Sequence, residues 1–224
     1  MPDTRRNSGA ARAALCGLLL AVMLVLGFIE STLPSGAVPG IKLGLSNGVL
    51  IFAVYLLDIP TAYILMSLKV LLSGLLFGGV SAMIYGFAGG LLSLTLMALL
   101  SRVKGLSPVV VSMAGGAAHN IGQVGMAMLI VSTAPLLGYL AVLLPVGLAC
   151  GALTGIAAKL VMQHLRTVIR PVKRASRRQT LVVLLAALLV IAVGVFALLR
   201  LPRGGVVIES EALPTMIPAV ERPF

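Results

Sequence analysis

The chain has 224 residues, of which 59% are hydrophobic and 10% are charged, and its mean hydropathy is +1.13. One core of this size could not bury so much apolar surface, so the composition excludes a soluble globular domain and indicates an integral membrane protein. The formal net charge of +11 is typical of nucleic-acid binding, but the Lys and Arg residues lie where a membrane topology needs them, and we expect no nucleic-acid partner.

Apolar segments long enough to form transmembrane helices follow one another along the chain. A helix needs about 20 apolar residues to cross a hydrocarbon layer of roughly 30 Å. The sequence therefore predicts an all-α polytopic membrane protein with seven helices, six of them in one compact core. The predicted spans are 13–29, 44–57, 61–78, 81–100, 108–131, 136–160 and 180–199. The second span is short for a full crossing, and only Phe77, Gly78 and Gly79 separate the third span from the fourth.

Changes in composition divide the chain into five segments. The apolar core gives way to a basic hydrophilic segment that contains Pro171, and an isolated apolar helix and a tail rich in Glu and Pro follow. The expected segments are a cytoplasmic N-terminus at 1–12, a six-helix membrane core at 13–165, a basic cytoplasmic linker at 166–179, a seventh transmembrane helix at 180–200 and an extracytoplasmic tail at 201–224.

Basic residues flank the spans unevenly and predict the orientation. Arg5, Arg6 and Arg12 precede the first span, which we expect to be an uncleaved helix because no small-x-small cleavage site follows it. With this end inside, most basic residues outside the spans are cytoplasmic, as the positive-inside rule requires. The exceptions are Lys42, Arg200, Arg203 and Arg222. The sequence therefore predicts an integral protein of the bacterial inner membrane with a cytoplasmic N-terminus.

Small residues four positions apart recur in the spans and let helix backbones approach closely in lipid. The rows are Ala13 with Gly17 and Ala21, Gly74 with Gly78, Gly86 with Gly90, and Gly147 with Gly151 and Gly155. We expect these rows to pack within the chain, except on the first helix. There Ala10 and Ala14 add a second row, and one row could face a partner protein. The candidate partner interface is Ala10, Ala13, Ala14, Gly17 and Ala21.

Polar residues interrupt the fifth predicted span. The spacing of His119 and Gln123 places them on one helix face with Asn120 beside them. Several nearby glycines, at 115, 116, 122 and 125, have no side chain to fill the space around these residues. We therefore expect a polar notch with room above it. An imidazole and two amides suit a small molecule rich in heteroatoms better than a bare ion. The alternative is a hydrogen-bonded polar seam between helices.

A lysine stands near the middle of the third predicted span. Lys69 cannot easily reach either membrane surface, so it needs an anion or a polar cavity. A ligand carboxylate or phosphate would serve, and so would pairing with Asp58 or with carbonyl groups at a helix break. Lys42 and Asn47 lie where the longest outer loop enters the second helix, and they could contact a ligand from above. The alternative is a loop that only joins two helices.

Signatures of catalysis and of metal binding are absent from the sequence. It has no paired carboxylates, no Walker loop, no GxSxG motif and no HExxH motif. Cys16 and Cys150 lie within spans and have no spaced His or Cys partners, so we expect them to pack as small apolar residues. We therefore expect no enzyme activity, no cofactor and no metal, and any energy for transport would come from a gradient or from another protein.

The segments 39–47, 69–78, 88–93 and 117–123 together resemble the Gx transporter family, also called heptaprenyl diphosphate synthase component I, over about residues 12–165. That family is similar to the substrate-binding S components of energy-coupling factor transporters, which are six-helix membrane proteins that capture vitamins or related micronutrients outside the cell. The resemblance implies a pocket formed by Lys42, Asn47, Lys69, His119, Asn120 and Gln123. It also implies that small residues of the first helix dock a membrane T component driven by two ATPase subunits. The basic segment and the seventh helix depart from this pattern.

These observations favour a membrane protein that captures a small vitamin-like or anionic nutrient from the extracytoplasmic side for uptake. One alternative is a non-catalytic membrane accessory subunit of a heptaprenyl diphosphate synthase. The elongation chemistry itself needs clustered aspartates that hold magnesium and diphosphate, and the sequence has none. A second alternative is a structural membrane assembly protein, which pairing of the polar residues with one another would favour.

Overall fold

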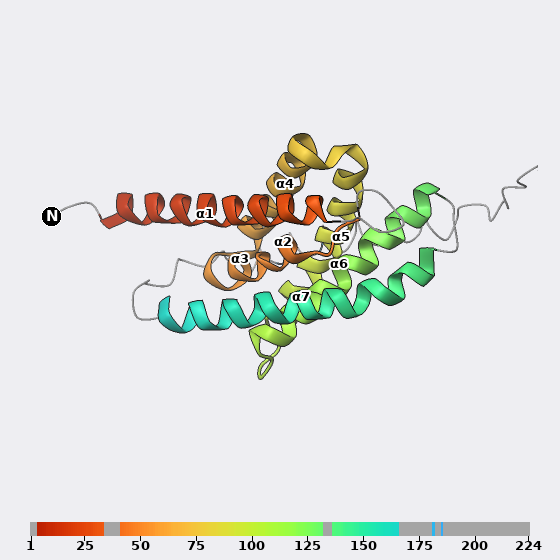
Figure 1. Cartoon of the computed structure of the whole chain (residues 1–224). Coiled ribbons are helices and arrows are strands. Elements are labelled where there is room, and N and C mark those ends of the chain that lie inside the picture. The colour runs from red at the N-terminus through yellow and green to blue at the C-terminus, as the bar shows by residue number, and fades with distance from the viewer. Residues whose placement is uncertain (1–3, 34–40, 132–135, 166–180, 182–184, 186–224) are drawn as a thin grey trace, which may run out of the picture.

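The computed structural model describes residues 4–33, 41–131, 136–165, 181 and 185. Regular structure in these ranges is helical throughout, which confirms the all-α prediction. The elements in chain order are α1 (Thr4–Thr32), α2 (Leu45–Gly48), α3 (Leu50–Leu56), α4 (Ile59–Ser73), the π-helical turn η1 (Gly74–Gly78), α5 (Gly79–Leu100), α6 (Pro108–Val131) and α7 (Leu136–Leu165) (Figure 1). The predicted linker and tail, and all but two positions of the predicted seventh helix, lie outside the described residues.

Three helical stretches of the described chain are long and apolar enough to cross a membrane. They are Gly9–Thr32, Ile59–Leu100 and Gly138–His164. Such stretches are typical of a membrane protein, as the composition predicts. Helix α6 has the bounds of the fifth predicted span but is less apolar, because His119, Asn120 and Gln123 interrupt it. The six crossings of the core and the side of the N-terminus stay predictions.

The second predicted span is broken into two short helices. Helix α2 follows Gly44, whose φ of 93° lies in the left-handed region, and Val49 separates α2 from α3. Together these helices cover only Leu45–Leu56, and a helix of that length spans roughly 18 Å. The prediction of a complete crossing at 44–57 is therefore wrong for this segment by itself. The side chain of Asp58 then caps α4 by accepting a hydrogen bond from the Thr61 N–H at 2.9 Å.

A sharp reversal separates the third predicted span from the fourth, at the glycines that the sequence indicates. Gly79 has φ 72° and ψ 177°, a conformation that L side chains rarely adopt. Contacts across the turn show that α4 and α5 run antiparallel, because a Cβ added at Gly74 would meet Met83 and one added at Gly90 would meet Met66. The long apolar stretch Ile59–Leu100 is thus a helical hairpin.

Glycines let α6 approach α5 on one side and α7 on the other. A Cβ added at Gly116 would lie 2.1 Å from the carbonyl oxygen of Gly147, and one added at Gly151 would lie 2.5 Å from that of Ser112. On the opposite side, a Cβ added at Gly122 would lie 2.8 Å from the Cα of Gly89. The prediction that the glycine row of α7 packs within the chain is therefore confirmed.

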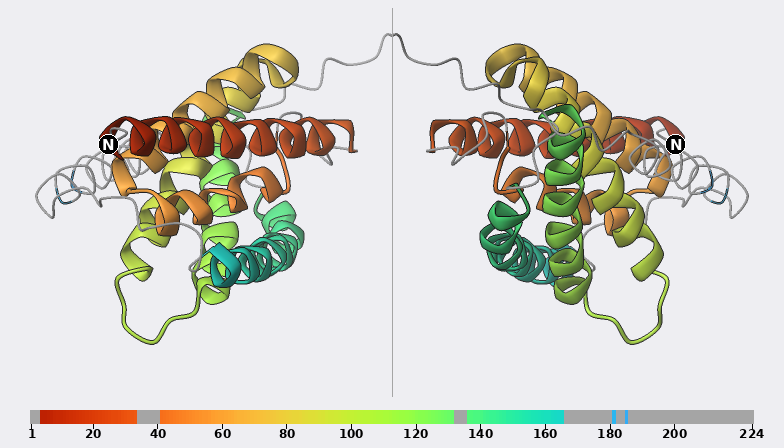
Figure 2. Two further views of the ribbon diagram at one scale, coloured as in Figure 1. Left: turned by 90° about the vertical axis from the view of Figure 1, so that its left-hand side faces the viewer. Right: turned by 90° about the vertical axis from the view of Figure 1, so that its right-hand side faces the viewer.

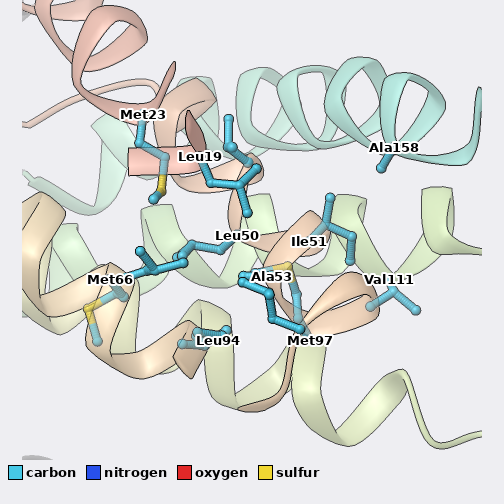
Figure 3. Close-up of a cluster of buried hydrophobic side chains, with 14 of the residues drawn as sticks. Leu19, Met23, Leu50, Ile51, Ala53, Met66, Leu94, Met97, Val111 and Ala158 are labelled. Carbon is cyan, nitrogen blue, oxygen red and sulfur yellow. The ribbon is translucent and has the colours of Figure 1, made fainter. Parts of the chain in front are cut away.

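The hydrophobic core is centred on α3. Leu50, Ile51 and Ala53 of this helix are buried among side chains from five other helices (Figure 3). The surrounding side chains are Leu19 and Met23 of α1, Met66 of α4, Leu94 and Met97 of α5, Val111 of α6 and Ala158 of α7. Helices α1 and α7 lie on opposite sides of α2 and α3 (Figure 1), and the views of Figure 2 show α6 between the α4–α5 hairpin and α7. The broken helix thus joins the two sides of the molecule.

One face of α1 is open in the described structure. A Cβ added at Gly17 would meet no atom within 4 Å. Next to this face, the Arg12 guanidinium donates hydrogen bonds to the Asp58 carboxylate and to the Thr61 hydroxyl, which fastens α1 to the first turn of α4. The candidate interface residues are all exposed: Ala10, Ala13, Ala14, Gly17 and Ala21. The first-helix row therefore differs from the glycine row of α7, which packs against α6.

A leucine placed in the α6–α7 contact is expected to destabilise the protein. In Gly151→Leu the new side chain would overlap backbone atoms of Ser112 and Met113, and such overpacking costs about 1–3 kcal/mol or more. The matched control is Gly17→Leu, which adds the same side chain to open space and should change stability by less than about 0.5 kcal/mol. Unfolding of both variants in the same detergent micelles measures the difference. Equal losses would contradict the assignment of these two glycine rows.

Candidate functional site

The six candidate binding residues come from four segments that meet inside the helix bundle. Lys42 lies just before α2, Asn47 lies in α2, and Lys69 lies in α4. Helix α6 contributes the remaining three, His119, Asn120 and Gln123. Five of the six are buried, and Lys42 is partly buried. Residues as far apart as Lys42 and Gln123 thus become neighbours.

Gln123 holds the backbone of Lys42 with two hydrogen bonds. The Lys42 N–H donates to Gln123 Oε1 at 3.1 Å, and Gln123 Nε2 donates to the Lys42 carbonyl at 2.9 Å. A side-chain amide therefore satisfies both backbone groups of Lys42. Because α6 is rigidly packed between α5 and α7, this pair of bonds fixes where the chain enters α2.

The two asparagines also bond to protein groups. Asn120 Nδ2 donates to the carbonyl of Leu143 at 2.6 Å, two residues before Pro145, which lies inside α7. Asn47 Nδ2 donates to Ser93 Oγ at 2.7 Å. In contrast, Asn47 Oδ1 is buried without a hydrogen-bond partner in the described structure. The amides therefore build part of a polar seam between helices, yet one of their oxygens is left available.

His119 is packed between two glycines. A Cβ added at Gly44 would lie 2.8 Å from its Cδ2 atom, and a Cβ added at Gly89 would lie 2.8 Å from its Nδ1 atom. Only glycine at these two positions leaves space for the imidazole ring. Within the described residues the Nδ1 atom has no hydrogen-bond partner, which is costly for a buried nitrogen. The ring is thus fixed in position with one polar atom unused.

The predicted room above these side chains is filled by other helices. A Cβ added at Gly115 would lie 2.6 Å from Met97, and the glycines at 116 and 122 admit the backbones of α7 and α5. Among the four glycines, only Gly125 has open space beside it. The expectation of an open notch over His119 is therefore wrong at three of the four positions, because small residues in a bundle also let helices approach.

Glu30 belongs to the same cluster, although it is not among the candidate residues that the sequence predicts. Its carboxylate is 5% exposed and accepts hydrogen bonds from the Leu45 N–H, from the Ser46 N–H and, at 2.8 Å, from Ser46 Oγ. It therefore caps the first turn of α2 from a different helix. Its position at the end of a long apolar run, as one of only six acidic residues, was the available signal.

Lys42 and Lys69 carry the positive charge of the site. The ammonium of Lys42 lies 4.8 Å from the centre of the Phe77 ring. Burial lowers the pKa of Lys42 below its usual value, and the negative charge of Glu30 opposes that shift. Lys69 is 5% exposed, and Glu30 and Lys42 are the charged groups within electrostatic range of it. Both lysines are also within electrostatic range of His119.

Asp58 does not neutralise Lys69. Its carboxylate is occupied by Arg12 and by Thr61, so the pairing that the sequence left open as an alternative does not form. In the part of the chain that the structure describes, Lys69 makes no hydrogen bond or ion pair. A buried ammonium group in this state is costly and attracts an anion.

Metal-binding side chains are dispersed in the described ranges. No three His, Cys, Asp or Glu residues gather there, and Cys16 and Cys150 are free thiols. The donors of the site are instead two ammonium groups, an imidazole and three amides. These groups can neutralise an anion and form hydrogen bonds in both directions, which is the chemistry of small-molecule recognition.

Comparison with known proteins identifies one family. A family model described as heptaprenyl diphosphate synthase component I matches residues 19–161. No curated protein and no solved structure matches the chain. The matched range begins within α1, ends within α7 and contains all six candidate residues as well as Glu30. Most of the candidate partner interface on α1 precedes it.

Removal of the Gln123 side chain is expected to loosen the entry to α2. Gln123→Ala leaves the Lys42 N–H and carbonyl without partners, which costs about 1–3 kcal/mol for each buried group. We expect faster amide hydrogen exchange at residues 42–48 in this variant. The control is Ile121→Ala, because Ile121 is exposed on the same helix. Unchanged exchange in Gln123→Ala would show that the loop does not depend on this contact.

Proposed function

The chain belongs to the heptaprenyl diphosphate synthase component I family, and we propose that it is a membrane protein that captures a small anionic or vitamin-like molecule for uptake. In this proposal it lies in the bacterial inner membrane with its N-terminus in the cytoplasm. The helices up to residue 165 form the capture core, and the molecule enters from the extracytoplasmic side. The chain itself catalyses no reaction.

Lys69 carries this proposal. It is a buried ammonium group that makes no ion pair with a described residue, and it lies near a second lysine that is partly exposed. Protein interiors rarely keep such a group unless a ligand or a water-filled cavity uses it. The unbonded Asn47 Oδ1 and His119 Nδ1 supply an acceptor and a further polar atom among the buried candidate residues. Asn120 and Gln123 shape the site by fixing α7 and the Lys42 segment.

Energy for uptake would come from a gradient or from another protein, because the sequence contains no nucleotide-binding loop. We propose that the open face of α1 docks a membrane T component that ATPase subunits drive. The exposure of the small residues on this face supports the proposal, since small residues allow close approach of another helix. Lipid covers the face when no partner is bound.

The second candidate is a non-catalytic membrane accessory subunit of a heptaprenyl diphosphate synthase. The description of the matching family favours it, since a component of a synthase has a protein partner. The hydrogen-bonded amides support a third reading, a structural assembly protein, because they hold helices together. Neither alternative explains a buried lysine without an anion, so we prefer capture.

Native mass spectrometry of the protein purified from its own host tests the proposal. A retained small molecule, with or without ATPase subunits, would support capture and identify the substrate. An empty protein that co-purifies with a soluble prenyl synthase would instead establish the accessory role. An empty protein with neither partner would favour the structural reading.

Replacement of Lys69 is expected to weaken ligand retention more than folding. Lys69→Met keeps the length of the side chain and removes a buried charge, so stability should stay the same or rise, whereas affinity for an anion should fall about tenfold or more. Ligand occupancy by mass spectrometry and unfolding in detergent are measured on the same sample. Lys159→Met is the control, because Lys159 is exposed on α7. An equal loss of occupancy and stability would assign Lys69 to the fold.

Bulky residues on the open face of α1 are expected to prevent docking. Ala14→Leu combined with Gly17→Leu should reduce co-purification of a partner protein about tenfold, because two leucines hold the helices apart. Ligand occupancy should be unchanged. Ala149→Leu with Ala157→Leu adds the same bulk to exposed positions of α7 and serves as the control. If the α1 variant retains its partner at the wild-type level, another surface forms the dock.

A further inference from the structure

The charges of the candidate site do not balance within the described structure. The acidic residues in the described ranges are Glu30 and Asp58. Asp58 is bound by Arg12 at the first turn of α4 and is not available to the site. Two lysines therefore share one carboxylate, and the cluster of Lys42, Lys69 and Glu30 has one excess positive charge.

The position of Glu30 makes it the common neighbour of both lysines. Its carboxylate is bonded to Leu45 and Ser46, only three and four residues after Lys42. The Phe77 ring, over which the Lys42 ammonium lies, also packs against Gly27 and Phe28, the residues one turn before Glu30. Lys69 is buried about two turns before Phe77 in the continuous stretch formed by α4 and η1, and Glu30 and Lys42 are the charged residues within electrostatic range of it.

His119 does not add to this charge. Its ring is 2% exposed, and a third positive charge in the same small volume would have no anion to offset it. The excess therefore equals one charge. Uncompensated charge in a bilayer interior is costly, so a ligand that brings one negative charge gains most from binding.

We propose that Glu30 determines the charge of the ligand that this site accepts, and that the accepted group is an oxygen anion with a single negative charge. A carboxylate or a singly charged phosphate ester has this chemistry. A doubly charged phosphate would leave the cluster with an excess negative charge beside Glu30, so it binds less well. This inference rests on the proposed capture function and narrows its substrate class.

Four aromatic probes of similar size separate charge from shape. Benzoate and methyl phenyl phosphate each carry one negative charge at pH 7, phenyl phosphate carries close to two because its second pKa is about 6, and benzamide carries none. Calorimetric titration of each probe into protein in lipid nanodiscs gives the four affinities. We expect the wild type to bind benzoate or methyl phenyl phosphate about tenfold more tightly than phenyl phosphate or benzamide. The order of the two singly charged probes distinguishes a carboxylate ligand from a phosphate ester.

Variants that change the charge of the cluster should change this order. Glu30→Gln leaves two excess positive charges and should make phenyl phosphate the preferred probe. Lys42→Met leaves none, so the preference for anions over benzamide should disappear. The double variant has the same excess charge as the wild type and should again prefer the singly charged probes. Ser46→Ala removes a hydrogen bond of Glu30 but no charge, and it should keep the wild-type order.

The outcomes separate this inference from the capture proposal. A wild-type preference for phenyl phosphate, or the same reordering in Glu30→Gln and Ser46→Ala, would overturn the role of Glu30 and leave capture standing. The same holds if no anion binds but a neutral molecule is retained from the host. If no probe binds and no molecule is retained, both proposals fail. If Glu30→Gln does not fold, the comparison of Lys42→Met with the wild type still decides the question.

Discussion

The close backbone contacts of α6 are the constraint on which the other features depend. Lipid offers no hydrophobic drive for helices to associate, so their attraction depends on packing at short range and on satisfied polar groups. Glycines at 116, 147 and 151 bring α6 and α7 together, and those at 89 and 122 bring α5 and α6 together. The helix held in this way carries His119, Asn120 and Gln123, which reach α7, the Lys42 segment and the glycines on either side.

Sequence reasoning succeeds where the cause is local. The reversal at Gly79 and the bounds of α6 follow from glycine chemistry and from the length of an apolar run. It fails where the cause is distant. The start of α2 depends on a carboxylate from α1 and on an imidazole that requires glycine at 44. The pairing of Gln123 with the Lys42 backbone and that of Arg12 with Asp58 likewise join residues that no spacing rule connects.

The candidate residues form two groups, those whose side chains are hydrogen-bonded to other parts of the chain and those that keep unbonded polar atoms. Asn120 and Gln123 use their amide groups on backbone atoms of other segments, which is the behaviour of a structural seam. The side chains of Lys42 and Lys69 form no hydrogen bond within the described chain. Asn47 and His119 each retain one polar side-chain atom without a hydrogen-bond partner. In the proposed function, the hydrogen-bonded seam holds the candidate binding groups in a fixed geometry before any ligand arrives.

Helix α1 is attached to the bundle near both ends of its apolar length. Arg12 fastens it to the first turn of α4, and Glu30, roughly 27 Å further along, fastens it to the first turn of α2. Between these points its small residues face away from the core. If α1 tilts about one of these two attachment points, the residues at the other attachment point are displaced. A force applied to the outer face of this helix would therefore act on the start of α2, just after Lys42.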